Sequence, residues 1–283
     1  MPRSDSTPAP SGYASIMVPM DLAPHAERRV SLAVGLADRF GGRLIGVAAQ
    51  QIIPPLYFES PTAGTPSIVE IEQRRVAEEL GKAEATFRRA AGKHKLVEWR
   101  QAIAFPNEYV IQQARAADLI VAARPAHSES AADRMAIDCG DLVMAAGRPV
   151  LFVPPRVDQI AAKRIVIGWT DTREARRAVR DSLPLLEEAK DVFVVSVDSE
   201  DIDDAGASDV GAYLACHGIS VSARGWPAPA RGIADELIRI AEGESADLIV
   251  CGAYGHSRAR QLVLGGVTRD LLDHAPVCCL MAH

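Results

Sequence analysis

The sequence predicts an α/β fold with two tandem, doubly wound, mainly parallel five-stranded sheets that carry helices on both faces. Three observations lead to this prediction. One apolar segment occurs twice in the chain, short apolar runs alternate with amphipathic stretches in each copy, and a proline pair separates the copies. Alternating strands and helices are typical of a parallel sheet whose crossover helices cover both faces.

The repeat divides the chain into two domains. The segment ADLIVAA at 117–123 returns as ADLIVCG at 246–252, and each copy later closes on a proline followed by an apolar strand. A repeat of roughly 130–150 residues has the size of a domain rather than of a solenoid unit. The predicted organisation is a disordered tail (1–12), a first domain (13–154), a linker (155–162) and a second domain (163–283).

Each domain is expected to hold its strands in the order 3-2-1-4-5. In the first domain we predict strands near 15–20, 43–49, 97–103, 118–123 and 149–153, and a helix over 108–116. In the second we predict strands at 164–169, 192–198, 219–225, 247–252 and 277–281, and helices near 173–189, 207–217, 230–243 and 267–274. The strands of the second half read as short continuous apolar runs, as expected for parallel strands buried on both faces. We interpret the proline-rich segment 51–67 as a surface insertion, with a lid or a partner surface as the alternatives.

Composition excludes several classes of function. Lys and Arg number 31 against 37 Asp and Glu, and a net charge of -6 does not suit a general nucleic-acid binder. No apolar stretch approaches the roughly 18–20 residues of a membrane helix, and the N-terminus lacks the apolar core of a secretory signal. The five cysteines show no paired spacing, which indicates a reducing compartment. We therefore expect a cytoplasmic protein without nucleic-acid or membrane partners.

The segment after the fourth strand of the second domain carries the main candidate site. The candidate residues there are Gly252, Gly255, Gly265, Gly266, Val267 and Thr268. The first two glycines let the backbone turn sharply and approach a ligand, and the second pair opens the last helix. The N–H groups at the start of that helix, with the Thr268 hydroxyl, are expected to bind a phosphate group. The alternative is a tight turn and a helix N-cap without a ligand.

A second group of candidate residues follows the first strand of the same domain. Ligands of doubly wound sheets bind beyond the carboxyl ends of the strands, where the strand order reverses. Asp171 and Thr172 leave the first strand at that place, beside the glycine loop. They are expected to offer a carboxylate and a hydroxyl to a ribose, a base or Mg²⁺. Capping of the following helix is the alternative role for both residues.

These features resemble the universal stress protein family. Its signature, G-x2-G-x9-G-[ST], follows the fourth strand, and Gly252, Gly255 and Gly265 match its spacing. The resemblance covers both halves, so the chain looks like a tandem universal stress protein, which implies that its fifth strands meet as an intrachain pseudo-dimer. It also implies ATP or a related adenine nucleotide as a ligand, with Mg²⁺, because some family members bind ATP while others do not.

The two halves depart from the family pattern in different ways. In the second half Gly266 replaces the signature Ser/Thr, and Asp171 lies one position later than the family's acidic residue. The first half keeps that acidic residue as Asp21, but 123–127 replaces the glycine turn and only Gly140 remains near the helix start. We therefore expect a nucleotide to bind once per chain, in the second half.

The sequence leaves three functions open. The first is a stress-response or regulatory protein whose second domain binds ATP or a related nucleotide. The second is a nucleotide-free module that binds an unknown protein partner, and the third is a weak nucleotide hydrolase. His256 is the only candidate general base near the glycine loop. We therefore expect a binding protein rather than a dedicated enzyme.

Overall fold

The computed structural model describes residues 12–52, 67–124, 134–197, 206–226, 232–254 and 266–283. The elements of the N-terminal half are β1 (Ser15–Pro19), α1 (Ala26–Phe40), β2 (Arg43–Ala49), α2 (Ile68–Ala91), β3 (Val97–Ala102), α3 (Pro106–Gln113), the 3₁₀ turn η1 (Ala114–Ala116), β4 (Leu119–Ala123), α4 (Cys139–Ala145) and β5 (Val150–Val153). Those of the C-terminal half are β6 (Arg164–Trp169), α5 (Arg173–Asp181), α6 (Leu183–Leu186), β7 (Asp191–Val197), α7 (Ala207–Cys216), β8 (Val221–Trp226), α8 (Ile233–Gly243), β9 (Leu248–Gly252), α10 (Val267–His274) and β10 (Cys278–Ala282). The α/β class and the mainly parallel sheet are confirmed.

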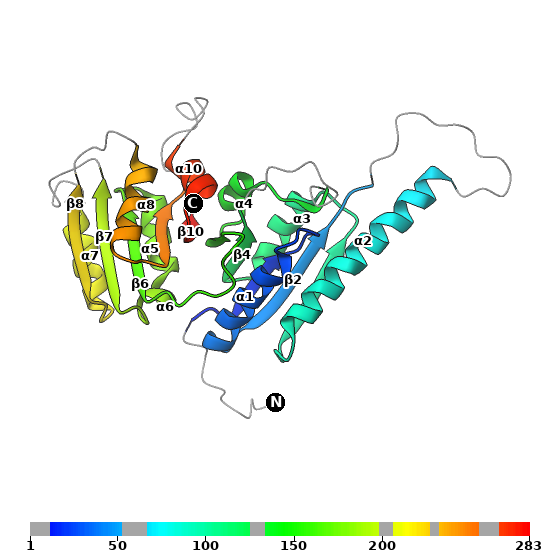
Figure 1. The fold of residues 1–283 in the computed structure, drawn as a ribbon, viewed down its shortest axis with the longest axis horizontal. Coiled ribbons are helices and arrows are strands. Elements are labelled where there is room, and N and C mark those ends of the chain that lie inside the picture. The colour runs from blue at the N-terminus through cyan, green and yellow to red at the C-terminus, as the bar shows by residue number, and fades with distance from the viewer. Residues whose placement is uncertain (1–11, 53–66, 125–133, 198–205, 227–231, 255–265) are drawn as a thin grey trace, which may run out of the picture.

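All the strands belong to one continuous sheet in the order β3-β2-β1-β4-β5-β10-β9-β6-β7-β8 (Figure 1). The two predicted five-stranded sheets are therefore continuous with each other. The fifth strands of the two halves, β5 and β10, pair antiparallel with Leu280 opposite Leu151, and every other pairing is parallel. Both strands are buried apolar runs, and an exposed edge of that composition would invite aggregation. Pairing removes both edges.

Helices cover both faces of the sheet, as predicted. The helices α1, α2, α5, α6 and α7 pack with one hydrophobic cluster, and α3, α4, α8 and α10 pack with a second. Alternation along the strands supplies both clusters, since Ile16 and Val18 of β1 lie in the first cluster while Met17 lies in the second. Between β5 and β6, residues 154–163 form neither helix nor strand.

One predicted helix is interrupted. The amphipathic pattern predicts a single helix over 173–189, but α5 ends at Asp181 and α6 begins at Leu183. Pro184 is the reason, because it has no N–H to donate and its ring would clash with the carbonyl four residues earlier. Ser182 closes α5 instead, with its N–H bonded to the Ala178 carbonyl and its hydroxyl to the Val179 carbonyl.

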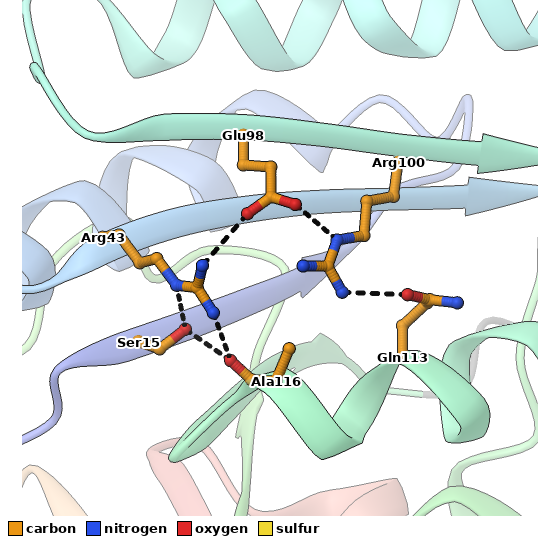
Figure 2. Close-up of polar contacts among 6 residues, drawn as sticks. All are labelled: Ser15, Arg43, Glu98, Arg100, Gln113 and Ala116. Atoms are coloured by element: carbon orange, nitrogen blue, oxygen red, sulfur yellow. Dashed lines mark hydrogen bonds and ion pairs between the residues drawn. The ribbon is translucent and has the colours of Figure 1, made fainter.

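The outer strand β3 carries charged side chains on its α3 face, as Figure 2 shows. Glu98 accepts hydrogen bonds from Arg100 Nε at 2.7 Å and from Arg43 Nη1 at 3.2 Å. Arg100 also donates to the Gln113 side chain of α3 at 2.9 Å. The strand at the opposite end of the sheet has a related arrangement, in which Arg224 of β8 pairs with Glu244. Charges on edge strands oppose pairing with another chain, so both ends of the sheet are protected.

Two polar contacts join the halves on the face opposite α3. The Tyr13 hydroxyl donates to the Asp181 carbonyl at 2.7 Å, and Arg39 pairs with Glu188 at 2.6 Å. The Asp181 carboxyl lies at the C-terminus of α5, where the helix dipole disfavours a negative charge. Burial raises the pKa of this carboxyl, against the lowering effect of Arg180, Arg148 and Arg177.

We expect Asp181→Asn to stabilise the protein at neutral pH. A carboxyl with a raised pKa in the folded state costs stability once pH exceeds its ordinary pKa, because the native state then holds an unfavourable charge. Below that pKa the group is protonated in both states and the cost disappears. The difference in urea midpoint between variant and wild type should therefore be positive at pH 7 and vanish near pH 3. A lower midpoint for the variant at pH 7 would contradict this reading.

Candidate functional site

The candidate site is built where β6 and β9 end. These strands are neighbours, with Gly168 opposite Cys251, and the order of connections reverses between them. The chain therefore leaves the sheet at the same edge after Trp169 and after Gly252. The sequence predicted that two groups of candidate residues would meet here, and the sheet brings their strands together.

Asp171 and Thr172 form the first wall. The Thr172 hydroxyl accepts the Ala175 N–H at 3.2 Å, so Thr172 is the N-cap of α5. The Asp171 carboxylate is exposed and pairs with Arg176 at 2.5 Å. The capping role, which the sequence left as an alternative, is therefore present for Thr172. Asp171 is left facing solvent at the start of α5.

Gly252 serves the packing of α5 on the sheet. A Cβ at this position would lie 2.5 Å from the Ala175 nitrogen and 2.8 Å from the Glu174 carbonyl carbon. These are backbone atoms of the first turn of α5, which cannot move aside as a side chain can. The glycine predicted to admit a ligand thus admits the helix that carries Asp171 and Thr172.

The first turn of α10 forms the second wall. Gly266 is its N-cap and supplies no side-chain hydrogen bond, and a Cβ there would meet nothing within 4 Å. Thr268 is 6% exposed, and its hydroxyl accepts the Tyr254 N–H at 3.2 Å. Among the described residues no side chain caps the first N–H groups of α10, and the Thr268 hydroxyl joins α10 to the segment that follows β9. Val267 lies partly buried beside them.

Gly255, Gly265 and His256 lie outside the residues that the structure describes. Tyr254, the last described residue before them, has a left-handed backbone with φ of 55°. A side chain in this region is strained, and such strain is found at turns and at functional sites.

A pocket of about 570 Å³ adjoins the first wall. Its lining residues are Trp169, Asp171, Arg176, Val179, Gly206, Asp209, Val210 and Tyr213. Tyr213 of α7 is 39% exposed and presents an aromatic ring, while Asp171 and Asp209 present carboxylates. Sequence reasoning placed Trp169 and Asp171 at the end of the first strand of this half, but it missed the residues that α5 and α7 contribute, because their spacing carries no ligand signature. In the described residues no cluster of three His, Cys, Asp or Glu side chains is arranged to hold a metal ion.

In the N-terminal half, the acidic residue that follows the first strand forms its polar contacts within the protein. Asp21 follows β1, and its carboxylate pairs with Arg29 of α1 at 2.9 Å. Its other oxygen accepts the Ala23 N–H at 3.0 Å. Arg29 is only 3% exposed and also donates to the Pro19 carbonyl. The carboxylate that the family pattern reserves for a ligand is thus held by the protein itself.

The start of α4 differs from the start of α10 in charge. Asp138 is the N-cap of α4, and its carboxylate accepts the Asp141 N–H at 2.7 Å. The Cys139 thiol donates to the Ala123 carbonyl, and burial raises its pKa to about 12. Gly140 lies against Tyr254, since a Cβ there would be 2.9 Å from the tyrosine oxygen. A negative charge and an aromatic ring therefore stand where a phosphate would have to approach.

Comparison with known proteins supports the resemblance. Residues 230–283 match the sequence model of the Universal stress protein family. Among solved structures, a universal stress protein from Archaeoglobus fulgidus superposes with a TM-score of 0.65 at 12% identity over 95% of each chain. A protein of unknown function from Pseudomonas aeruginosa gives 0.51 at 17% identity, over 94% of this chain and 91% of its own. A search of curated proteins found no significant match.

The two comparisons cover different parts of the chain. At these identities the solved structures show the fold over nearly the full length, and the sequence match shows the family pattern over the C-terminal segment. The resemblance to universal stress proteins that the sequence indicates is therefore confirmed. None of the described helices is long and apolar enough to span a membrane.

We expect Gly252→Ala to lower the free energy of unfolding by about 1–3 kcal/mol, as overpacking against rigid atoms does. The added Cβ would press on the backbone of Glu174 and Ala175. Gly266→Ala is the matched control, because its Cβ enters open space and should change stability by less than ~0.5 kcal/mol. Urea unfolding of both variants measures the difference. Equal stabilities would mean that α5 does not rest on Gly252.

Proposed function

We propose that this chain is a tandem, two-domain universal stress protein that binds ATP or a related adenine nucleotide once, in the domain formed by residues 163–283. The first domain, residues 13–154, is joined to it through the linker 155–162 and through the β5–β10 pairing, as a pseudo-dimer within one chain. The protein acts by binding, as a stress-response or regulatory protein, and not as a dedicated enzyme. Its five free cysteines support a cytoplasmic location.

The contrast between Gly266 and Asp138 carries the proposal. Both residues are the N-caps of the helix that precedes the last strand of their half. Gly266 leaves the first N–H groups of α10 without a capping side chain, and such groups, with the helix dipole, favour a phosphate. Asp138 fills the same position on α4 with a carboxylate, which repels one. The two halves therefore share a fold and differ in the charge presented to a phosphate.

The pocket beside β6 supports an adenine nucleoside as the remaining part of the ligand. Its volume is about 570 Å³, and the Tyr213 ring offers a face for stacking of a base. The carboxylates of Asp171 and Asp209 can accept hydrogen bonds from ribose hydroxyls or an exocyclic amine. We expect Mg²⁺ to enter with the nucleotide, because in nucleotide sites this ion is bound by phosphate oxygens together with one or two carboxylates and several waters.

A second candidate function is a nucleotide-free module for an unknown protein partner. Ile103 and Phe105, between β3 and α3, are 55% and 57% exposed, which is a large apolar exposure for one short connection. A weak nucleotide hydrolase is a third candidate, because the first turn of α10 carries a carboxylate, Asp270, that could act as a general base. Nucleotide binding measured directly separates the first proposal from both alternatives.

The proposal predicts opposite outcomes for two variants of Gly266. Gly266→Asp copies the cap of α4, and we expect it to weaken ATP binding by at least tenfold through charge repulsion at the phosphate. Gly266→Asn has the same shape without the charge and should bind ATP within a few-fold of wild type. Both side chains enter open space from a backbone with φ of -106°, so both variants should fold. Calorimetric titration of the full chain measures affinity and stoichiometry.

Three results would contradict the proposal. These are no ATP binding by the wild-type chain, equal affinities for the Asp and Asn variants, or a stoichiometry of two nucleotides per chain. The first would favour the nucleotide-free module. Release of inorganic phosphate at a rate that depends on enzyme concentration would instead favour the hydrolase.

A further inference from the structure

The described residues that directly follow β4 and β9 contact the other half across the junction. Arg124 follows β4, and its Nη1 donates to the Ala275 carbonyl at 2.5 Å and to the Leu271 carbonyl at 3.3 Å. Both acceptors lie at the C-terminal end of α10 in the other half. In the opposite direction, Tyr254 follows β9 and rests on Gly140 of α4. The contacts are therefore reciprocal.

Arg124 completes the C-terminal end of α10. The Leu271 carbonyl also accepts the Ala275 N–H at 3.0 Å, and a cation beside the last carbonyls of a helix interacts favourably with the helix dipole. Burial lowers the pKa of the Arg124 guanidinium, yet arginine remains charged at any physiological pH. In the described residues no other side chain donates to the carbonyls of Leu271 and Ala275. A residue of the first half thus satisfies a helix of the second.

Tyr254 secures the other end of the same helix. Its N–H donates to the Thr268 hydroxyl in the first turn of α10, and its half-buried ring lies against α4. Its left-handed backbone is unfavourable for a residue with a side chain and persists only where neighbouring groups hold it. Here Thr268 holds the backbone while Gly140 gives room to the ring.

We propose that the first half is a positioning element for the nucleotide site of the second half, with Arg124 and the Gly140 surface fixing the two ends of α10. This inference rests on the proposed function, because the first turn of α10 carries the amides assigned to the phosphate. A helix of two turns held at both ends presents its N-terminal amides in one geometry, and that preorganisation increases affinity. The segment 123–127, which replaces the glycine turn in the first half, includes Arg124. The sequence change that removes the turn therefore also supplies the arginine that contacts α10.

A second arginine that joins the two halves provides a control that distinguishes positioning of α10 from general stabilisation of the junction. Arg39 pairs with Glu188 and donates to the Ala161 carbonyl at 3.0 Å, so it too joins the halves. Neither partner of Arg39 belongs to α10 or to the segment after β9. If these contacts only hold the halves together, removing either arginine should affect nucleotide binding equally.

The test compares Arg124→Ala, Arg124→Lys and Arg39→Ala in the full-length chain. We expect Arg124→Ala to weaken ATP binding about tenfold, which is the loss of one charge-assisted hydrogen-bonding group. Hydrogen exchange of the amides over 267–274 should be faster in the same variant without nucleotide. Lysine retains the charge and should recover part of both losses. Arg39→Ala should leave ATP affinity and exchange over 267–274 within twofold of wild type.

A fourth variant tests the contact at the other end of α10. Gly140→Ala adds a Cβ that would lie 2.9 Å from the Tyr254 hydroxyl and 3.1 Å from Asp138 Oδ1, while alanine is the better helix former. Because the gain in helix propensity offsets the pressure on the cap, we expect stability to change by less than ~1 kcal/mol while ATP binding weakens about threefold. Unchanged ATP affinity in both Arg124→Ala and Gly140→Ala would overturn the inference, as would an equal loss in Arg39→Ala and Arg124→Ala. If the wild-type chain does not bind ATP, the proposed function and the positioning role both fail. If Arg124→Ala binds ATP as wild type does and its hydrogen exchange over 267–274 is unchanged, only the positioning role fails.

Discussion

The antiparallel pairing of β5 with β10 is the contact on which the architecture depends. Each half ends on a strand whose residues are all buried, so neither half can leave that strand at an open edge without exposing an apolar surface. Joining the two strands turns two edges into the middle of one sheet. The edges that remain, β3 and β8, carry Glu98, Arg100 and Arg224, whose charges oppose further pairing. The sheet is therefore closed to growth although it is not closed into a barrel.

The same pairing places corresponding loops of the two halves near one another, and their differences then become complementary. Asp138 caps α4 with a carboxylate, whereas Gly266 leaves the start of α10 without a side-chain cap. Asp21 is neutralised by the buried Arg29, whereas Asp171 is exposed at the start of α5. A buried ion pair of this kind is costly to break, because removing one partner leaves an uncompensated charge. The carboxylates of the first half thus form contacts within the protein, whereas the corresponding positions of the second half face solvent.

Much of the fold was predictable because it depends on local pattern. Short apolar runs located the inner strands to within a few residues, and alternation explains why helices cover both faces. The break between α5 and α6 was missed because the apolar periodicity continues through Ser182, while the interruption comes from the ring of Pro184. The resemblance implied that the fifth strands meet, whereas their antiparallel direction and register follow from hydrogen bonds between strands far apart in sequence.

The candidate site was less predictable than the fold. The glycines were identified from their spacing, but Gly252 is required by the backbone of α5, which no spacing reveals. Arg124 and Tyr254 could not be assigned from the sequence at all. The carbonyls that Arg124 binds are 147 and 151 positions away, and the importance of Tyr254 arises from its φ angle and from Gly140 in the other half. Residues whose roles depend on the junction become visible only when the junction is known.

The charges around the site determine which interactions can hold a nucleotide in this acidic chain. The net charge is -6, so the long-range field does not attract a polyanion. Two arginines among the described residues near the site are paired, since Arg176 contacts Asp171 and Arg269 lies 3.6 Å from Asp273. The α10 amides add a short-range field that depends on their direction. Binding by oriented dipoles requires a rigid helix, and this requirement explains why anchoring α10 from the first half would matter for affinity.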